Sequence, residues 1–159
     1  MHLDPSITHS LTSRQQVLQH IGRVARDWQY AILKWMHNRI EDFPEGSDLD
    51  IVIRPADLPK WRALLDQLSG DMQWRETRYG AFVQLFLQGG QYLELDLLHR
   101  LQWKGLDFLS IDPIIAKRKL SHEGLHIASE VDNFHYICWF FGLNACQVPQ
   151  KYQDYLHKL

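Results

Sequence analysis

The chain has 159 residues, of which 45% are hydrophobic and 23% are charged, a composition typical of one globular domain. Its formal net charge of −2 does not indicate a broad surface for nucleic acid or membrane, and it leaves a local basic groove open. No stretch reaches the roughly 18 apolar residues of a membrane span, and no signal peptide is recognisable. We interpret the two cysteines, Cys138 and Cys146, as buried reduced thiols of a cytoplasmic protein.

The first half of the chain predicts two helices and two strands. Thr12 and Gln15 resemble a capping box, and apolar residues at helical spacing predict a helix over 12–27. Aromatic and apolar residues predict a strand over 28–35, and a second strand is predicted over 49–54. The next helix begins near Pro55 and ends at Gly70, because proline is favoured early in a helix and glycine just after it.

Three further strands are predicted, over 72–77, 81–88 and 91–98. Gly89-Gly90 predicts a two-residue hairpin turn between the last two. Because side chains alternate along a strand, Glu94 and Asp96 share one face of the last strand while three leucines share the other. The acidic face is either a solvated edge or the wall of a site.

Helices follow to the end of the chain, over 113–119, 130–146 and 149–159. The expected fold is therefore α/β or α+β, a mixed sheet flanked by helices. Residues 1–110 form its core, and residues 111–159 form a helical extension packed on that core as one compact unit. Phe134, Trp139 and Phe141 are either helix-packing core or a surface that meets a partner domain or a second copy of the chain.

The strand over 49–54 carries the most informative motif, Asp48-Leu49-Asp50. Residues i and i+2 of a strand point to the same face, about 7 Å apart at the backbone, so the two carboxylates lie side by side. Carboxylates this close repel each other unless a cation lies between them, and a hard divalent metal ion that carries phosphate oxygens suits such a site. The alternative is a solvated turn, since Gly46-Ser47-Asp48 is also good turn chemistry.

Asp96 supplies a third carboxylate on a later strand. With it, the chain resembles the nucleotidyltransferase superfamily of the DNA polymerase β-like fold, and most of all its small bacterial members. The resemblance covers roughly residues 12–110 and rests on 47–53 and 93–97, which are similar to that family's Asp-x-Asp strand and to its third-Asp strand. It implies the nucleotidyltransferase-like fold for the core.

The resemblance also implies an activity. The enzyme would move a nucleoside monophosphate from a nucleoside triphosphate such as ATP to a hydroxyl acceptor that the sequence does not identify. Asp48, Asp50 and Asp96 would be the catalytic residues and would hold two Mg²⁺ ions, or Mn²⁺. Trp103 is either an aromatic residue of an acceptor or base pocket or part of the core.

One element departs from the family. Its Gly-Ser belongs at the end of the first strand, where this chain has Leu33-Lys34-Trp35, and Gly46-Ser47 lies just before the acids instead. Either Lys34 supplies the phosphate-binding charge, with Ser47 as a second nucleotide contact, or the phosphate site is degraded. In the second case the domain is a catalytically inactive module for nucleotide binding or for interaction.

His122-Glu123-Gly124-Leu125-His126 matches the H-E-x-x-H pattern of zinc hydrolases. That chemistry requires a helix, so that both histidines bind one metal ion. Gly124 inside the motif and the extended character of 125–129 oppose a helix, and no third ligand follows at the expected spacing. A loop or hairpin is the favoured interpretation, with a zinc hydrolase as a remote third function.

Overall fold

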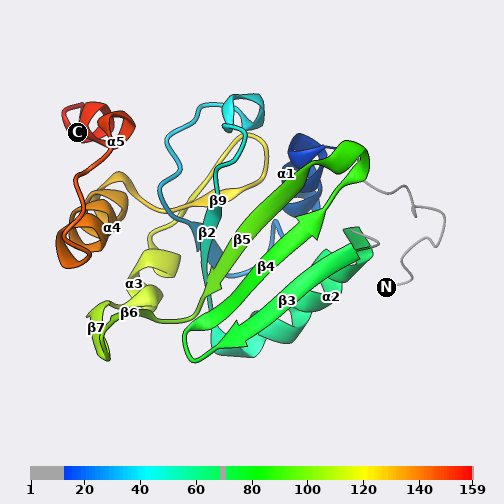
Figure 1. The fold of residues 1–159 in the computed structure, drawn as a ribbon, viewed down its shortest axis with the longest axis horizontal. Helices are drawn as coiled ribbons and strands as arrows, with labels where there is room; N and C mark the ends of the chain where they lie inside the picture. The colour runs from blue at the N-terminus through cyan, green and yellow to red at the C-terminus, as the bar shows by residue number, and fades with distance from the viewer. Residues whose placement is uncertain (1–12, 69–70, 159) are drawn as a thin grey trace.

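A seven-stranded mixed sheet forms the centre of the fold in the computed structural model, which describes residues 13–68 and 71–158. Its strand order is β3-β4-β5-β2-β1-β9-β8, and Figure 1 shows the first four of these strands side by side. Two neighbouring pairs, β2 with β5 and β1 with β9, run parallel, and the other neighbours run antiparallel. The strands are β1 (Tyr30–Ile32), β2 (Leu49–Ile53), β3 (Asp71–Thr77), β4 (Gly80–Phe86), β5 (Tyr92–Leu98), β8 (Lys119–Leu120) and β9 (His126–Ile127).

Five α-helices and a separate two-stranded hairpin complete the described part of the chain, so the expected mixed sheet with flanking helices is confirmed. The helices are α1 (Arg14–Val24), α2 (Leu58–Leu68), α3 (Ile111–Ala116), α4 (Glu130–Leu143) and α5 (Gln150–Leu156). The hairpin pairs β6 (Leu101–Trp103) with β7 (Leu106–Leu109), and single 3-10 turns lie at η1 (Ile40–Asp42), η2 (Pro55–Asp57) and η3 (Gln88–Gly90).

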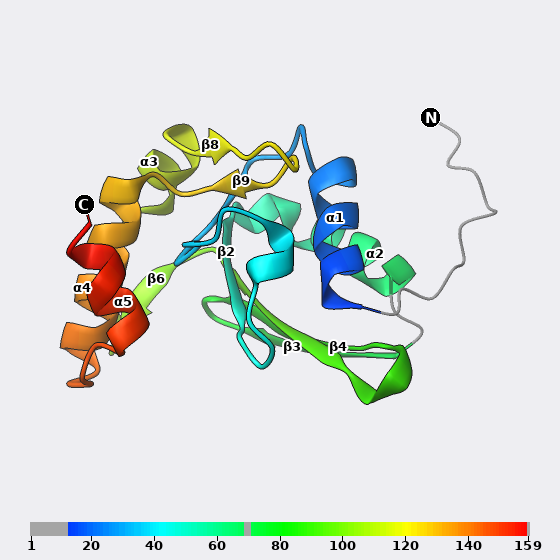
Figure 2. The same cartoon turned by 90° about the horizontal axis from the view of Figure 1, so that it is seen from above.

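One face of the sheet is covered by α1 and α2. Figure 2 shows both helices on the same side of β3 and β4. Every second residue of β5 points to this side, and Leu93, Leu95 and Leu97 are all fully buried there. Burying a leucine side chain stabilises a fold by roughly 1.5–3 kcal/mol, so the alternation holds β5 in one register.

The opposite face is covered only in part. Ile114 and Ile115 of α3 and Tyr136 of α4 pack with Ala31 and Val52, so residues of the C-terminal segment cover β1 and β2. Over β3, β4 and β5, no helix of the described residues lies on this side (Figure 2). The sheet therefore has a boundary near β2 and β5 where a covered surface gives way to an open one.

The first helix begins one residue later than its predicted cap. Ser13 is the N-cap, and its hydroxyl accepts a hydrogen bond of 3.2 Å from the backbone N–H of Gln16. The predicted cap, Thr12, lies outside the described residues, as does Gly70, the predicted end of α2.

Two predictions about strands are wrong. The strand predicted over 28–35 is confined to Tyr30–Ile32, because Lys34 has a left-handed φ of 54° that turns the chain away from the sheet. The connection from β4 to β5 is not a two-residue turn at Gly89-Gly90, since the Phe86–Tyr92 pair ends the ladder and residues 87–91 form the loop. Both glycines have positive φ within it.

The exposure of the long helix bears on the two interpretations of its aromatic residues. Phe134 and Trp139 are 40% and 48% exposed, so neither is part of the helix-packing core. Both cysteines are exposed, so the prediction of buried thiols is wrong. The residues that the helix buries are Asp132, Asn133, Tyr136 and Ile137.

None of the helices in the described ranges combines the length and the apolar character that crossing a bilayer requires.

Candidate metal centre

Three aspartates converge where β2 lies beside β5. The parallel register pairs Asp50 with Asp96, so their side chains leave the sheet on the same face. Asp48 is two residues before Asp50 and projects to that face as well. Each of the three offers a carboxylate oxygen, and these oxygens all lie within 4.8 Å of one another. Among the described residues, this is the only group of three or more His, Cys, Asp or Glu placed to hold a metal ion.

The position of the acids follows from the local sequence. Leu49–Ile53 is buried throughout because β2 lies between two hydrophobic clusters. Asp50 is therefore only 4% exposed, whereas Asp48, before the strand, is exposed. On β5 the buried leucines fix the register, and Asp96 is half-buried on the opposite face.

The loop before β2 is held by the first helix. A guanidinium nitrogen of Arg14 donates a hydrogen bond to the carbonyl oxygen of Ser47, and the guanidinium lies 4.8 Å from the ring centre of Phe43. Ser47, predicted to contact the nucleotide, lines a small cavity of about 20 Å³ together with Lys34 and Asp48. It is not among the residues that line the two larger cavities at the acids.

Lys34 points into the acid cluster. Its ammonium nitrogen contacts Oδ2 of Asp50 and lies 3.8 Å from Oδ2 of Asp48. Its side chain is 11% exposed. The lysine predicted to hold phosphate is thus bound to the carboxylates predicted to hold metal.

Burial and crowding of charge perturb the acids and bases of this cluster. Burial, followed by the negative charges of Asp50 and Asp48, raises the pKa of Asp96 to about 7. Burial also raises the pKa of Asp50, and the Lys34 ammonium opposes that shift. For Lys34, burial alone would lower the pKa, but the carboxylate of Asp50 outweighs it and the pKa lies above its ordinary value. The lysine is therefore charged at neutral pH.

Two open cavities meet at the cluster. The larger, of about 630 Å³, lies on the uncovered face of β3, β4 and β5 and reaches Asp48 and Asp96. The smaller, of about 240 Å³, lies between the sheet, the β6–β7 hairpin and α4, and it reaches all three aspartates. Trp103 lines the smaller cavity, so of its two interpretations the structure favours the pocket.

The smaller cavity contains aromatic residues that the sequence analysis did not assign to a site. Tyr136, Phe140 and Phe108 line it, and the rings of Phe108 and Tyr136 are stacked with centres 6.3 Å apart. Burial and then the three aspartates raise the pKa of Tyr136 well above its ordinary value. The signal that was missed is Lys104-Gly105, a two-residue turn with φ of 47° and 91° between short apolar runs, which marks the β6–β7 hairpin.

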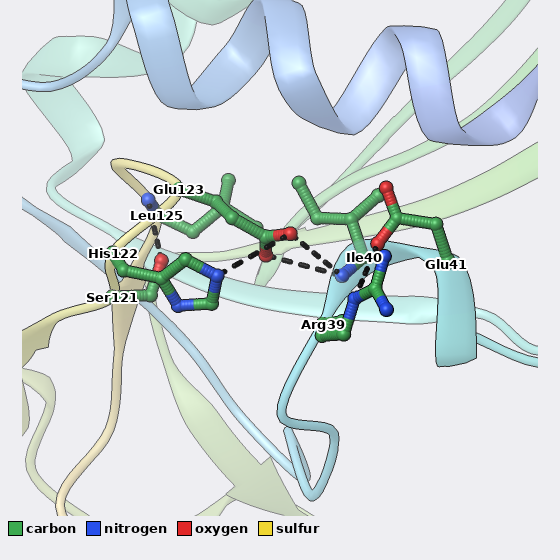
Figure 3. A network of polar contacts seen from close by, with 7 residues as sticks. All are labelled: Arg39, Ile40, Glu41, Ser121, His122, Glu123 and Leu125. Atoms are coloured by element: carbon green, nitrogen blue, oxygen red, sulfur yellow. Dashed lines mark hydrogen bonds and ion pairs between the residues drawn. The ribbon is translucent and has the colours of Figure 1, made fainter.

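The His122–His126 segment is not helical. It forms the turn of the β8–β9 hairpin, as expected, and its two histidines lie in different environments. The His122 side chain is 69% exposed, while His126 is buried with Nε2 2.6 Å from the carbonyl oxygen of Arg26. The carboxylate of Glu123 accepts the backbone N–H of Ile40 at 3.1 Å from each oxygen (Figure 3). The glutamate therefore caps η1 and is not placed beside two histidine ligands.

The fold and the site together define an α+β protein with a three-carboxylate cluster at the boundary of its sheet. Comparison of the chain with protein-family models, with curated proteins and with solved structures found no match. The functional argument therefore rests on the residues themselves.

Proposed function

We propose that this protein is a divalent-metal-dependent nucleotidyltransferase with the DNA polymerase β-like fold that its sequence resembles. The observation that carries the proposal is the convergence of the Asp48, Asp50 and Asp96 carboxylates within 4.8 Å at the meeting point of two open cavities. Carboxylates on neighbouring strands beside an open cavity are what metal-assisted phosphoryl transfer requires.

The donor set fits the proposed cation. Carboxylate oxygens are the hard ligands that Mg²⁺ and Mn²⁺ prefer. The group contains no histidine or cysteine, the softer ligands that would favour zinc. When bound, such an ion would neutralise charge on the triphosphate oxygens. Asp48, Asp50 and Asp96 would hold it, in keeping with their predicted role.

The residues around the acids support two further roles. Asp96 borders both cavities, so it is placed either to hold the ion or to accept the proton of an acceptor hydroxyl. The smaller cavity offers Trp103 and Phe108, and its aromatic faces suit a planar base. The larger cavity, open and more polar, is then available to the acceptor.

A second candidate function has its own supporting observation. Lys34 already partly neutralises Asp48 and Asp50, and the chain lacks a Gly-Ser at the end of β1. Both features favour a nucleotide-binding or interaction module that has lost catalysis.

Titration with each of the four ribonucleoside triphosphates, with Mg²⁺ or with EDTA, distinguishes the two candidate functions. If the protein is an enzyme, we expect metal-dependent binding of at least one nucleotide. Asp48→Asn and Asp50→Asn are then expected to abolish this binding while the circular dichroism spectrum is retained. Arg62→Gln, an exposed substitution on α2, serves as the control and is expected to bind normally. Binding that is equal in EDTA supports the inactive nucleotide-binding module. No binding at millimolar nucleotide overturns the enzyme and leaves only an interaction module.

A further inference from the structure

Lys34 fixes a positive charge inside the acid cluster. The ammonium group contacts one oxygen of Asp50 and approaches one oxygen of Asp48, and these two carboxylates are its ion-pair partners within the described residues. Asp96 is not within ion-pair distance of it. One side of the cluster is thus neutralised by the protein itself.

Several contacts hold Lys34 in this place. Its φ of 54° is a left-handed conformation that residues with a Cβ rarely adopt. The backbone N–H of Lys34 donates a 2.9 Å hydrogen bond to Oδ1 of Asn133, which is 2% exposed in α4. The ammonium nitrogen also lies 5.3 Å from the ring centre of Phe140 on the same helix. Together these contacts indicate that the Lys34 side chain is held in a fixed position.

The cluster has a closed side and an open side. Lys34 approaches from the closed side, where it lines a cavity of only about 20 Å³ with Tyr152 and Ser47. Asp96 does not line that cavity but borders both large ones. Asp48 borders all three cavities, so it separates the lysine from the open side.

We infer that the Lys34 ammonium replaces one of the two metal ions expected at this site, so that the cluster binds a single divalent ion. The inference rests on the proposed function, since it concerns the same carboxylates. When all three carboxylates are ionised, as a bound cation favours, they and the ammonium leave two negative charges, which one divalent ion neutralises. A second divalent ion would have to lie close to the fixed ammonium, where like charges repel strongly in a partly buried site.

The number of bound ions tests the inference. Free Mn²⁺ is measured by electron paramagnetic resonance while metal-free protein is titrated with Mn²⁺ alone. The wild-type chain is expected to bind one ion at the cluster. Lys34→Met, which keeps most of the side-chain length, and Lys34→Gly, which suits the positive φ, are both expected to bind two.

Two controls keep the count tied to the cluster. Lys60→Met removes an exposed lysine on α2, whose ammonium lies over the ring of Trp28, and is expected to leave one bound ion. Asp48→Asn added to Lys34→Gly is expected to remove the gain, because Asp48 faces the open side. If Lys34→Met does not fold by circular dichroism, Lys34→Gly carries the test, since glycine adopts this backbone conformation readily.

Each outcome has one meaning. Two ions in the wild-type chain, or a single ion in both Lys34 variants even if bound more tightly, overturns the inference and leaves the metal site of the proposed function intact. No ion bound by any variant overturns the proposed function and this inference together. One ion in the wild type and two in both Lys34 variants supports the inference.

Discussion

The chain contains two motifs whose residues match metal sites, and only the aspartates form a cluster in the described part of the structure. The aspartates at β2 and β5 come together at the mouth of two cavities, although Asp50 and Asp96 are 46 positions apart in the sequence. His122 and His126 are only four residues apart, and one is exposed while the other is buried against Arg26. Residue types at a given spacing therefore identify a site only when the backbone between them has the required period.

The difference arises from backbone geometry. A strand directs residues i and i+2 to one face, and its parallel neighbour adds a third acid in register. The histidine motif needs the helical period, but Gly124 has a φ of 86° and ends any helical continuation. We therefore expect opposite effects of substitution in the two motifs. Replacing an acid should weaken ligand binding and stabilise the metal-free fold, while replacing a residue of the histidine segment should destabilise the fold or leave metal binding unchanged.

The largest expected effect is a loss of metal binding when an aspartate, but not a histidine, is replaced. Asp96→Asn is expected to weaken Mn²⁺ binding at least about 100-fold, because it removes one of three charged ligands, whereas His122→Ala is expected to leave it unchanged. Isothermal titration calorimetry with Mn²⁺ and then with Zn²⁺ measures both. Zn²⁺ bound with micromolar affinity and lost in His122→Ala would contradict the comparison and revive the zinc hydrolase.

The second prediction concerns the fold. A Cβ on Gly124 would lie 2.5 Å from the backbone oxygen of Gly22 in α1, and its φ already disfavours any other residue. Gly124→Ala is expected to lower the free energy of unfolding by about 2 kcal/mol, measured by urea denaturation. Mn²⁺ binding by the folded protein is expected to be unchanged.

Gly142→Ala provides the matched control for that substitution. A Cβ at Gly142, in α4, has no neighbouring atom within 4 Å, and its φ is not in the left-handed range. Alanine in a helix is expected to be neutral or to stabilise the protein by up to about 1 kcal/mol. If the two glycine variants unfold alike, the close approach of the 121–125 turn to α1 is not what holds that hairpin.

The sequence was sufficient to predict the acids but not their surroundings. Alternation of leucine with Glu94 and Asp96 on β5 is a strong local pattern, and so is the buried run after Asp48, so both strands were predicted within one residue or two. Their parallel pairing is not predictable in this way, because nothing local to either strand encodes its neighbour. The nucleotidyltransferase assignment itself stays a prediction.

Tertiary packing determines which residues of α4 are buried, and the sequence does not predict this. Helix α4 is apolar on nearly every side, so its pattern did not indicate that Asn133 and Tyr136, not Phe134 or Trp139, face the core. Asn133 is buried because its amide oxygen accepts the N–H of Lys34, a contact between residues 99 positions apart. Such long-range polar pairs have no periodic signature in a sequence.

The smallest expected effect is a dependence of stability on pH. Asp96 titrates near 7 in the folded protein and near 3.9 when unfolded, so between these values the folded state binds more protons. The free energy of unfolding of the metal-free protein therefore falls as pH rises from about 4 to 7. Asp96→Asn removes this loss, and is expected to be more stable than the wild type at pH 8 by roughly 1 kcal/mol after allowance for solvent screening at a partly exposed side chain.

Thermal unfolding in EDTA at pH 5 and pH 8 measures the effect, with an expected gain in Tm of a few degrees at pH 8 and a smaller one at pH 5. Excess Mg²⁺ at pH 8 is expected to reverse the order, because a ligand that binds only the folded wild type stabilises it. A site retained for its ligand should show this reversal, since a bound cation offsets the burial and the crowding of negative charge that weaken the empty cluster. An acid retained for the fold would instead destabilise the protein when replaced, at either pH and with or without Mg²⁺.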